Sequence, residues 1–336
     1  MTFPAASLGT SGLSISRVGF GAWAVGGGGS RFGWGSQEDD DSVRAIRHAV
    51  DRGVNWVDTA AFYGYGHSEE VVGRALKEMG NDRPLVFTKC GLRWDDNGDP
   101  HNRMAPDSVR EECEASLRRL GVDVIDLYQV HWPPTDGTPL EEYWAVMAEL
   151  RDSGKVRAIG LSNHDVKQLE QAEQVAHVDS LQPPFSLVSR DAAADLIPWC
   201  QENGTGVIVY SPMQSGLLSG AMTQERIDNL PDDDWRKSNP DFTGEGGRRN
   251  LALAEALRPV ADRHDVSCAA VAVAWTLAWR GVTGAIVGAR TPEQVDGWID
   301  GADLALTARD LDELTEAVKR TGAGSGPADP RTTAHS

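Results

Sequence analysis

Residues 125–161 read IDLYQVHWPPTDGTPLEEYWAVMAELRDSGKVRAIGL, and this segment alone indicates the architecture of the chain. An apolar run at 125–131 is followed by a polar loop, and apolar residues then recur at helical spacing over 140–153. A second β-branched run occupies 156–161. This order is typical of a β–α–β unit with two parallel strands.

The same layout recurs on both sides of this segment. Strands are predicted at 18–25, 55–58, 85–89, 125–131, 156–161, 179–182, 207–210 and 285–287. Helices are predicted at 39–52, 68–78, 106–120, 140–153, 165–175, 192–203, 250–264 and 267–280. Eight such units that close on themselves predict a single-domain α/β protein with the (β/α)8 fold of the TIM barrel, and an open doubly wound sheet is the alternative.

Three segments fall outside the repeat. The sequence LGTSGL at 8–13 predicts an N-terminal β-hairpin ahead of the barrel. Residues 213–249 form a long polar insert of the kind that usually makes a lid or a binding loop. An extra C-terminal helix is predicted at 307–319, so we expect a barrel domain over residues 1–320 and a disordered tail, rich in Gly, Pro and Ser, over 321–336.

The charge of the chain excludes several classes of partner. It has 32 lysines and arginines against 50 aspartates and glutamates, a net charge of −18, so neither nucleic acid nor an anionic membrane surface is expected as a partner. Without glycine, the longest apolar run is Cys268–Trp275, which is too short to span a bilayer. The four cysteines form no CxxC pair, and no signal peptide is apparent, so we expect a soluble cytoplasmic protein with reduced thiols.

Four polar side chains fall at the ends of predicted strands or just beyond them, namely Asp58, Tyr63, Lys89 and His131. Each of them alone has an ordinary structural interpretation, such as a helix cap or a core residue. The active site of a TIM barrel lies at the carboxyl ends of its strands, so we expect the four to meet there.

These four groups together suit the protonation of an oxygen atom. A phenol has an ordinary pKa of about 10 and is a weak acid near neutrality. A neighbouring cation lowers such a pKa by about 1–3 units, so Lys89, kept charged by Asp58, is expected to lower the pKa of Tyr63. His131, neutral or charged, would hydrogen-bond to a carbonyl oxygen. No metal is expected at this site, and the hydride that reduces the carbonyl carbon would have to come from a cofactor.

Longer motifs carry a resemblance to a known family. They are DTAAFYG at 58–64, TK at 88–89, VH at 130–131, GKVRAIGLSN at 154–163 and YSPMQSGLLSG at 210–220. In this order they resemble the aldo/keto reductases, and the resemblance runs from about residue 13 to residue 318. It implies that Tyr63 is the general acid/base, that Lys89 and Asp58 tune it, and that His131 orients the substrate.

The resemblance also implies a nicotinamide dinucleotide as cofactor. Residues matching the nicotinamide site are Ser162, Asn163 and Gln182, with Tyr210 stacking under the ring. Residues matching the pyrophosphate loop include Ser211, Met213, Ser215 and Gly216. Residues matching the last phosphate site are Gly288, Arg290 and Gln294, and Arg290 is the expected partner of the 2′-phosphate of NADP(H).

The chain departs from the family pattern at three places. Gly297 and Trp298 stand where the family often has an acidic residue and Asn, which leaves NAD(H) as an alternative cofactor. Gln294 occupies a position that can be Arg. His164 follows Asn163 where an aromatic residue is usual.

The substrate is the least determined feature. Trp23, Trp94 and Trp132 fall on strand-end loops and are predicted to line an apolar substrate pocket. We expect an open site that accepts bulky or sugar-like carbonyl compounds. The sequence does not determine the oligomeric state.

The function predicted from these observations is the reversible, NADP(H)-dependent reduction of an aldehyde or ketone to an alcohol. One alternative is a lyase in which Lys89 forms a Schiff base, as in barrel aldolases. Another is a cofactor-binding subunit that senses redox state and turns over slowly.

Overall fold

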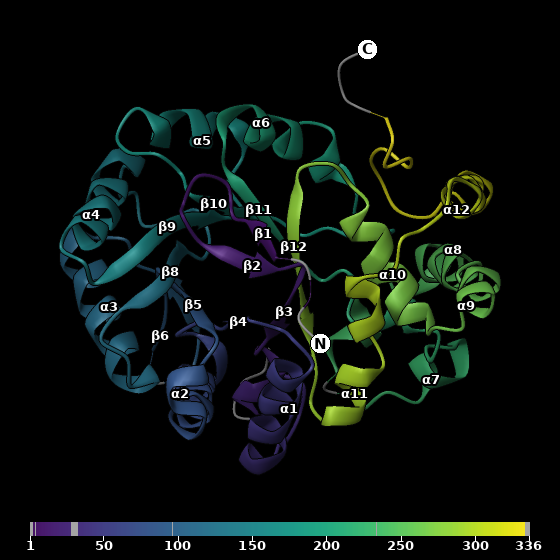
Figure 1. Cartoon of the computed structure of the whole chain (residues 1–336), viewed down its shortest axis with the longest axis horizontal. Helices are drawn as coiled ribbons and strands as arrows, with labels where there is room; N and C mark the ends of the chain where they lie inside the picture. The colour runs from purple at the N-terminus through teal and green to yellow at the C-terminus, as the bar shows by residue number, and fades with distance from the viewer. Residues whose placement is uncertain (1–2, 4, 28–32, 96, 233, 333–336) are drawn as a thin grey trace.

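The computed structural model describes residues 3, 5–27, 33–95, 97–232 and 234–332. Eight parallel strands close into a barrel in the order of the chain, and helices surround the barrel (Figure 1). The barrel strands are β3 (Val18–Gly21), β4 (Trp56–Asp58), β5 (Leu85–Cys90), β8 (Ile125–Val130), β9 (Val156–Ser162), β10 (Ser180–Gln182), β11 (Gly206–Tyr210) and β12 (Val282–Gly288). The predicted single-domain (β/α)8 fold is confirmed.

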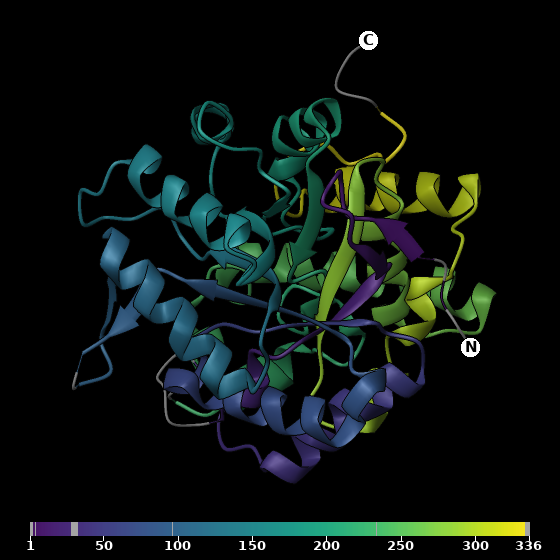
Figure 2. The same cartoon turned by 60° about the vertical axis from the view of Figure 1, so that its left-hand side comes forward.

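The helices of the described residues lie outside the strands (Figure 2). The α-helices are α1 (Asp39–Asp51), α2 (His67–Met79), α3 (Pro106–Leu120), α4 (Leu140–Asp152), α5 (Val166–Glu173), α6 (Leu196–Asn203), α7 (Gln224–Asp228), α8 (Gly244–Glu255), α9 (Arg258–His264), α10 (Cys268–Leu277), α11 (Pro292–Asp296) and α12 (Ala308–Thr321). Short 3-10 turns are η1 (Ala24–Gly26), η2 (Tyr63–Gly66), η3 (Gly80–Asp82), η4 (Asp191–Ala193), η5 (Leu217–Ser219), η6 (Trp235–Ser238) and η7 (Ile299–Ala302).

An N-terminal hairpin closes the amino-terminal end of the barrel. Strands β1 (Ala5–Ser7) and β2 (Ser14–Ser16) pair antiparallel and lie across the ring of strands (Figure 1). The hairpin contributes three apolar side chains to a cluster inside the barrel, whose members are Leu8, Leu13, Ile15, Trp56, Phe87, Leu127, Ala158, Ile208 and Ile286. The hairpin was predicted from the sequence, and its packing explains why this end of the barrel is filled with apolar side chains.

Trp56 is the largest side chain of this inner cluster, and glycines make room for it. A Cβ atom built on Gly19 would lie 2.2 Å from the Trp56 ring, and one on Gly284 would lie 3.1 Å from it. Trp56 also donates its indole N–H to the carbonyl of Ser16, at 2.9 Å. The small residues on neighbouring strands are therefore a steric requirement of the filled barrel.

Some predicted elements differ from the observed ones, and the helix predicted at 192–203, for example, is divided into η4 and α6. The strand predicted at 18–25 ends at Gly21, and the chain turns into η1, where the N–H of Val25 bonds to the carbonyl of Ala22. The single helix predicted at 250–264 is divided into α8 and α9. The division falls just before Pro259, because proline has no N–H and favours the first turn of a new helix.

The loop after β5 contains an element that sequence patterns did not predict. Strands β6 (Leu92–Trp94) and β7 (Pro100–Asn102) form a short antiparallel hairpin. The N–H of Met104 donates to Asp136 at 2.7 Å and fixes the far end of this loop. The hairpin stands at the side of the site described below.

The C-terminal residues differ from the expected disordered tail. Ser325 pairs with Ser189, and the Arg190 guanidinium donates to the carbonyls of Ala323 (3.2 Å) and Gly326 (3.3 Å). Buried Arg190 therefore ties the segment after α12 to the barrel, an anchor that composition alone does not reveal. Residues 333–336 lie outside the described residues, and the domain boundary at residue 320 stays a prediction.

Among the described residues, no helix combines the length and the apolar character that crossing a bilayer requires.

Replacing Gly19 by alanine tests the packing around Trp56. The new Cβ would overlap the indole ring, so we expect Gly19→Ala to lower the free energy of unfolding by about 1–3 kcal/mol, measured by urea denaturation. Gly288→Ala is the matched control, because its Cβ would meet its nearest neighbour at 3.4 Å. Equal stability of the two variants would contradict the steric argument.

Candidate active site

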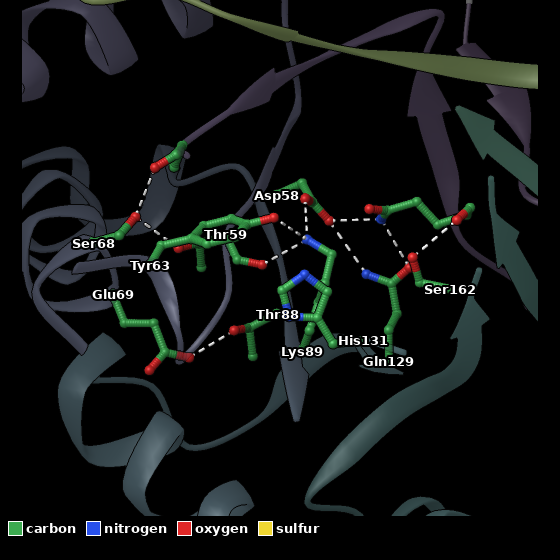
Figure 3. A network of polar contacts seen from close by, with 12 residues as sticks. Asp58, Thr59, Tyr63, Ser68, Glu69, Thr88, Lys89, Gln129, His131 and Ser162 are labelled. Atoms are coloured by element: carbon green, nitrogen blue, oxygen red, sulfur yellow. Dashed lines mark hydrogen bonds and ion pairs between the residues drawn. The ribbon is translucent and has the colours of Figure 1, made fainter. Parts of the chain in front are cut away.

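The structure brings the four predicted catalytic residues together at the carboxyl ends of adjacent strands. Asp58 ends β4, Lys89 lies in β5, His131 directly follows β8, and Tyr63 lies in the turn η2. Figure 3 shows their side chains converging on one point. The rings of Tyr63 and His131 meet edge to face, with 5.6 Å between centroids.

The Lys89 ammonium is the centre of the network. Its Nζ donates to Asp58 Oδ1 at 2.5 Å, to the carbonyl of Thr59 at 2.9 Å and to the Tyr63 hydroxyl at 3.3 Å. Lys89 is 1 % exposed, so all three ammonium protons find partners within the protein. The ammonium is thereby fixed beside the phenol.

The second oxygen of Asp58 is held by two amides. Asp58 Oδ2 accepts from Gln129 Nε2 at 3.2 Å and from Gln182 Nε2 at 3.0 Å. Sequence reasoning missed Gln129. It lies two residues before His131, so the period of a strand places it on the same face, and this spacing could have identified it.

Burial sets the protonation of the site. It raises the pKa of Tyr63 more than the Lys89 charge lowers it, so the net shift is upward, opposite to the expected direction. For Lys89, burial lowers the pKa, but Asp58 and Tyr63 outweigh it and the net shift is upward. Burial and then the Lys89 charge lower the pKa of His131 well below its ordinary value. At neutral pH the site thus holds a protonated phenol, an ammonium and a neutral imidazole.

The residues matched to the nicotinamide site form a second, connected network. Ser162 Oγ donates to the carbonyl of Gln182 at 2.9 Å. Asn163 Nδ2 donates to the carbonyl of His131 at 3.0 Å, and Asn163 Oδ1 accepts from the Tyr210 hydroxyl at 2.8 Å. Asn163 has φ +62°, a left-handed conformation that is uncommon for a residue with a side chain.

A cavity of about 1030 Å³ opens over these groups. All the residues predicted for cofactor binding line it: Ser162, Asn163, Gln182, Tyr210, Ser211, Met213, Ser215, Gly216, Gly288, Arg290 and Gln294. Arginines of the insert, Arg226 and Arg236, line it too, as does buried Trp298. The size of the cavity and the polar groups within its mostly apolar lining fit a dinucleotide together with a substrate.

Arg290 is already engaged within the protein. Its Nε donates to Gln37 Oε1 at 2.6 Å, its Nη1 to the carbonyl of Trp34 at 3.2 Å, and its Nη2 to the carbonyl of Ser36. Gln294 Oε1 accepts from the N–H of Arg290 at 2.8 Å. The guanidinium therefore faces acceptors from the segment between β3 and α1, which sequence reasoning did not predict.

The predicted substrate residues separate into two groups. Trp23 and Trp132 line the cavity, and Trp132 is 44 % exposed at its mouth. Trp94 is not among the residues that line it. Its ring packs behind the wall instead, 6.4 Å from the Phe62 ring and 5.5 Å from the Tyr65 ring. The hairpin β6–β7 causes this difference, because it turns Trp94 towards those rings.

Trp34 extends the aromatic wall and was not predicted. It meets Trp23 edge to face at 5.6 Å and Trp235 at 6.1 Å, between ring centroids. The Arg236 guanidinium lies 4.6 Å from the centre of the Trp34 ring. Two segments far apart in the sequence thus meet at the rim of the cavity.

A buried carboxyl group supports the end of β5. Glu112 of α3 accepts from the N–H of Gly91 at 3.0 Å and from Ser108 Oγ at 3.2 Å. Burial raises the pKa of Glu112 to about 7. Glu112 is therefore a titrating group that is hydrogen-bonded to Gly91, two residues after Lys89.

Comparisons with known proteins agree on one family. The sequence profile of the Aldo/keto reductase family matches residues 17–319. The NADH-specific methylglyoxal reductase of Escherichia coli (strain K12) is 34% identical over 328 residues, which cover 93% of this chain and 98% of the relative. The aldo-keto reductase YhdN of Bacillus subtilis (strain 168) is 36% identical over 318 residues, covering 94% and 93%.

Solved structures give the same result. The glycerol dehydrogenase AKR11B4 from Gluconobacter oxydans superposes with a TM-score of 0.85 at 36% identity, and 98% of each chain is covered. The holo form of the aldo-keto reductase AKR11C1 from Bacillus halodurans superposes with a TM-score of 0.76 at 27% identity, covering 94% of this chain and 96% of that one.

The raised pKa of Glu112 predicts a pH-dependent stability. The folded protein holds this proton up to pH 7, whereas the unfolded chain releases it near pH 4.5, so the contribution of Glu112 to the stability falls as the pH rises from 4.5 through 7. We expect Glu112→Gln to remove this component, so that its free energy of unfolding declines less than that of the wild type between pH 5 and pH 8. Parallel curves for the two proteins would refute the assignment.

Proposed function

The chain belongs to the aldo/keto reductase family and is an NAD(P)H-dependent oxidoreductase, and from this premise we propose that Tyr63 is the general acid/base in the reversible reduction of an aldehyde or ketone to an alcohol. The observation that carries the proposal is the contact of the Tyr63 hydroxyl with the Lys89 ammonium, itself held by Asp58. When bound, the reduced nicotinamide supplies a hydride to the carbonyl carbon.

The proton is the contribution of the protein. The protonated Tyr63 hydroxyl donates to the carbonyl oxygen as that oxygen gains negative charge. The resulting phenolate is stabilised by the ammonium of Lys89, 3.3 Å away. In the direction of alcohol oxidation, the same phenolate accepts the proton.

His131 positions the carbonyl group. Its lowered pKa keeps the imidazole neutral, so that one ring N–H can donate to the carbonyl oxygen without adding a second positive charge beside Lys89. The edge-to-face packing of the His131 and Tyr63 rings supports a shared binding point for that oxygen.

The walls of the cavity favour a neutral substrate. Trp23, Phe62 and Trp132 line it with aromatic surface, and Asn102 and Thr135 add a hydrogen-bonded polar pair, 2.9 Å apart. Aromatic surface with a few polar groups is the usual lining of a site that binds a small organic molecule and fixes its orientation. Open access at Trp132 supports sugar-like or bulky substrates, as expected from the sequence.

The lyase alternative is weaker than the reductase. A Schiff base requires a neutral amine, whereas Asp58 and Tyr63 raise the pKa of Lys89 and keep it charged. A slow redox-sensing subunit would have the same site. Its turnover would stay below about 1 per second on every carbonyl compound tried, and this rate distinguishes it from an enzyme. A cytoplasmic location remains a prediction.

Replacing Tyr63 by phenylalanine removes the proposed acid. We expect Tyr63→Phe to lower kcat by about 10²- to 10⁴-fold on a good aldehyde, with little change in the affinity for NAD(P)H measured by quenching of tryptophan fluorescence. Tyr65→Phe is the control, because the Tyr65 hydroxyl bonds to the carbonyl of Gly98 and lies outside the Lys89 network. Wild-type turnover of Tyr63→Phe would exclude the role.

The preference for NADP(H) rests on Arg290. A guanidinium suits the 2′-phosphate of NADP(H), but in this structure the phosphate must compete with Trp34, Ser36 and Gln37 for Arg290. We therefore propose that both cofactors are used, and that NADP(H) binding requires these contacts to open. Arg226 and Arg236 also line the cavity and favour the pyrophosphate that both cofactors share.

Two substitutions separate the cofactors. We expect Arg290→Ala to raise KM for NADPH at least about tenfold and to change KM for NADH much less, since only NADPH carries the extra phosphate. Gln37→Ala frees Nε of Arg290 and should lower KM for NADPH. Equal changes for NADH and NADPH in both variants would show that Arg290 does not bind the 2′-phosphate.

A further inference from the structure

A buried pair of polar side chains lies directly behind the proposed nicotinamide site. Tyr143 belongs to α4, and His164 follows β9 by two residues. Each is 1 % exposed. The Tyr143 hydroxyl lies 3.1 Å from His164 Nε2, and His164 Nδ1 lies 2.8 Å from the carbonyl oxygen of Ser162.

The chemistry of these partners defines the protonation of His164. A carbonyl oxygen only accepts, so Nδ1 carries the proton and donates to Ser162. The lone pair of Nε2 is then free to accept from the Tyr143 hydroxyl. Burial lowers the pKa of His164 to about 4, which agrees with a neutral ring that makes both bonds.

The backbone held by this chain of bonds has an uncommon conformation. Asn163, next to Ser162, has φ +62°, and a left-handed residue with a side chain persists where the surrounding contacts hold it. From the cavity side, the N–H of Asn163 donates to the carbonyl of Gln182, and its amide donates to the carbonyl of His131. His164 holds the same turn from the opposite side.

We propose that His164 and Tyr143 are positioning residues: they hold the Ser162–Asn163 turn in the conformation that presents its side chains to the nicotinamide end of the cofactor. This inference rests on the proposed function, because it takes Ser162 and Asn163 as cofactor-binding residues. Neither His164 nor Tyr143 lines the cavity, so both act through the turn.

A matched set of substitutions at His164 tests the bond to Ser162. His164→Phe keeps a ring but removes both bonds, whereas His164→Asn places an amide N–H close to the position of Nδ1 and can still donate to the Ser162 carbonyl. We expect Kd for NAD(P)H, measured by tryptophan quenching without substrate, to rise about tenfold in the Phe variant and to stay within about threefold of the wild type in the Asn variant.

The same measurement separates positioning from plain core packing. If His164 only fills space, Phe and Asn substitution both lower Tm, but the folded Phe variant binds NAD(P)H with wild-type Kd, and that outcome overturns the proposal. Because Kd is measured without turnover, a failure of Tyr63 as the acid leaves this result intact. Conversely, an unchanged Kd would leave the role of Tyr63 untouched.

Tyr143→Phe provides an independent test if His164→Phe does not fold. It removes one oxygen atom and leaves His164 Nε2 without its donor, so we expect Kd to rise about threefold. In the double variant, Tyr143→Phe should add almost nothing to His164→Phe, since both act through one chain of bonds. A Tyr143→Phe protein with unchanged Kd, or additive effects in the double variant, contradicts the pair.

Discussion

The ion pair between Lys89 and Asp58 is the interaction on which the site is built. Both groups are buried, and such a pair persists only when every remaining proton and lone pair is satisfied. Thr59 and Tyr63 take the other ammonium protons, and Gln129 and Gln182 hold the second carboxylate oxygen. Satisfying one buried charge pair thus fixes the phenol on one side and the floor of the nicotinamide site on the other.

Burial and charge act in opposite directions on the pKa values of Tyr63 and Lys89, and in the same direction on that of His131. Low polarity around Tyr63 keeps the phenol protonated and low polarity around His131 keeps the imidazole neutral, while Asp58 keeps Lys89 charged. Lys89 is therefore the single positive charge among these three groups, and the proposed acid, Tyr63, is a neutral donor beside it. The neutral imidazole of His131 adds no second positive charge.

Much of this architecture followed from sequence pattern. The repeat of apolar runs and amphipathic segments predicted the barrel, and the polar residues at strand ends predicted where Asp58, Lys89 and His131 would meet. Long-range effects were not predictable in the same way. The pKa of Tyr63 depends on how deeply the fold buries it, and the engagement of Arg290 depends on a segment some 250 residues earlier in the chain. Trp94 lies in a hairpin that was not predicted and packs against Tyr65, so it is not among the residues that line the cavity, and its role in substrate binding stays a prediction.

The hairpin β1–β2 determines the end of the barrel from which the active site is reached. Its apolar side chains plug the amino-terminal end of the barrel, so the reacting groups are reached from the carboxyl end. Among the described residues, the cavity over these groups opens at this carboxyl end, so a molecule bound in its outer part would delay the release of one bound beneath it. The amino-terminal end, which the hairpin closes, is by contrast a suitable place to attach a fusion partner or to immobilise the protein, because an attachment there does not block the entrance to the active site.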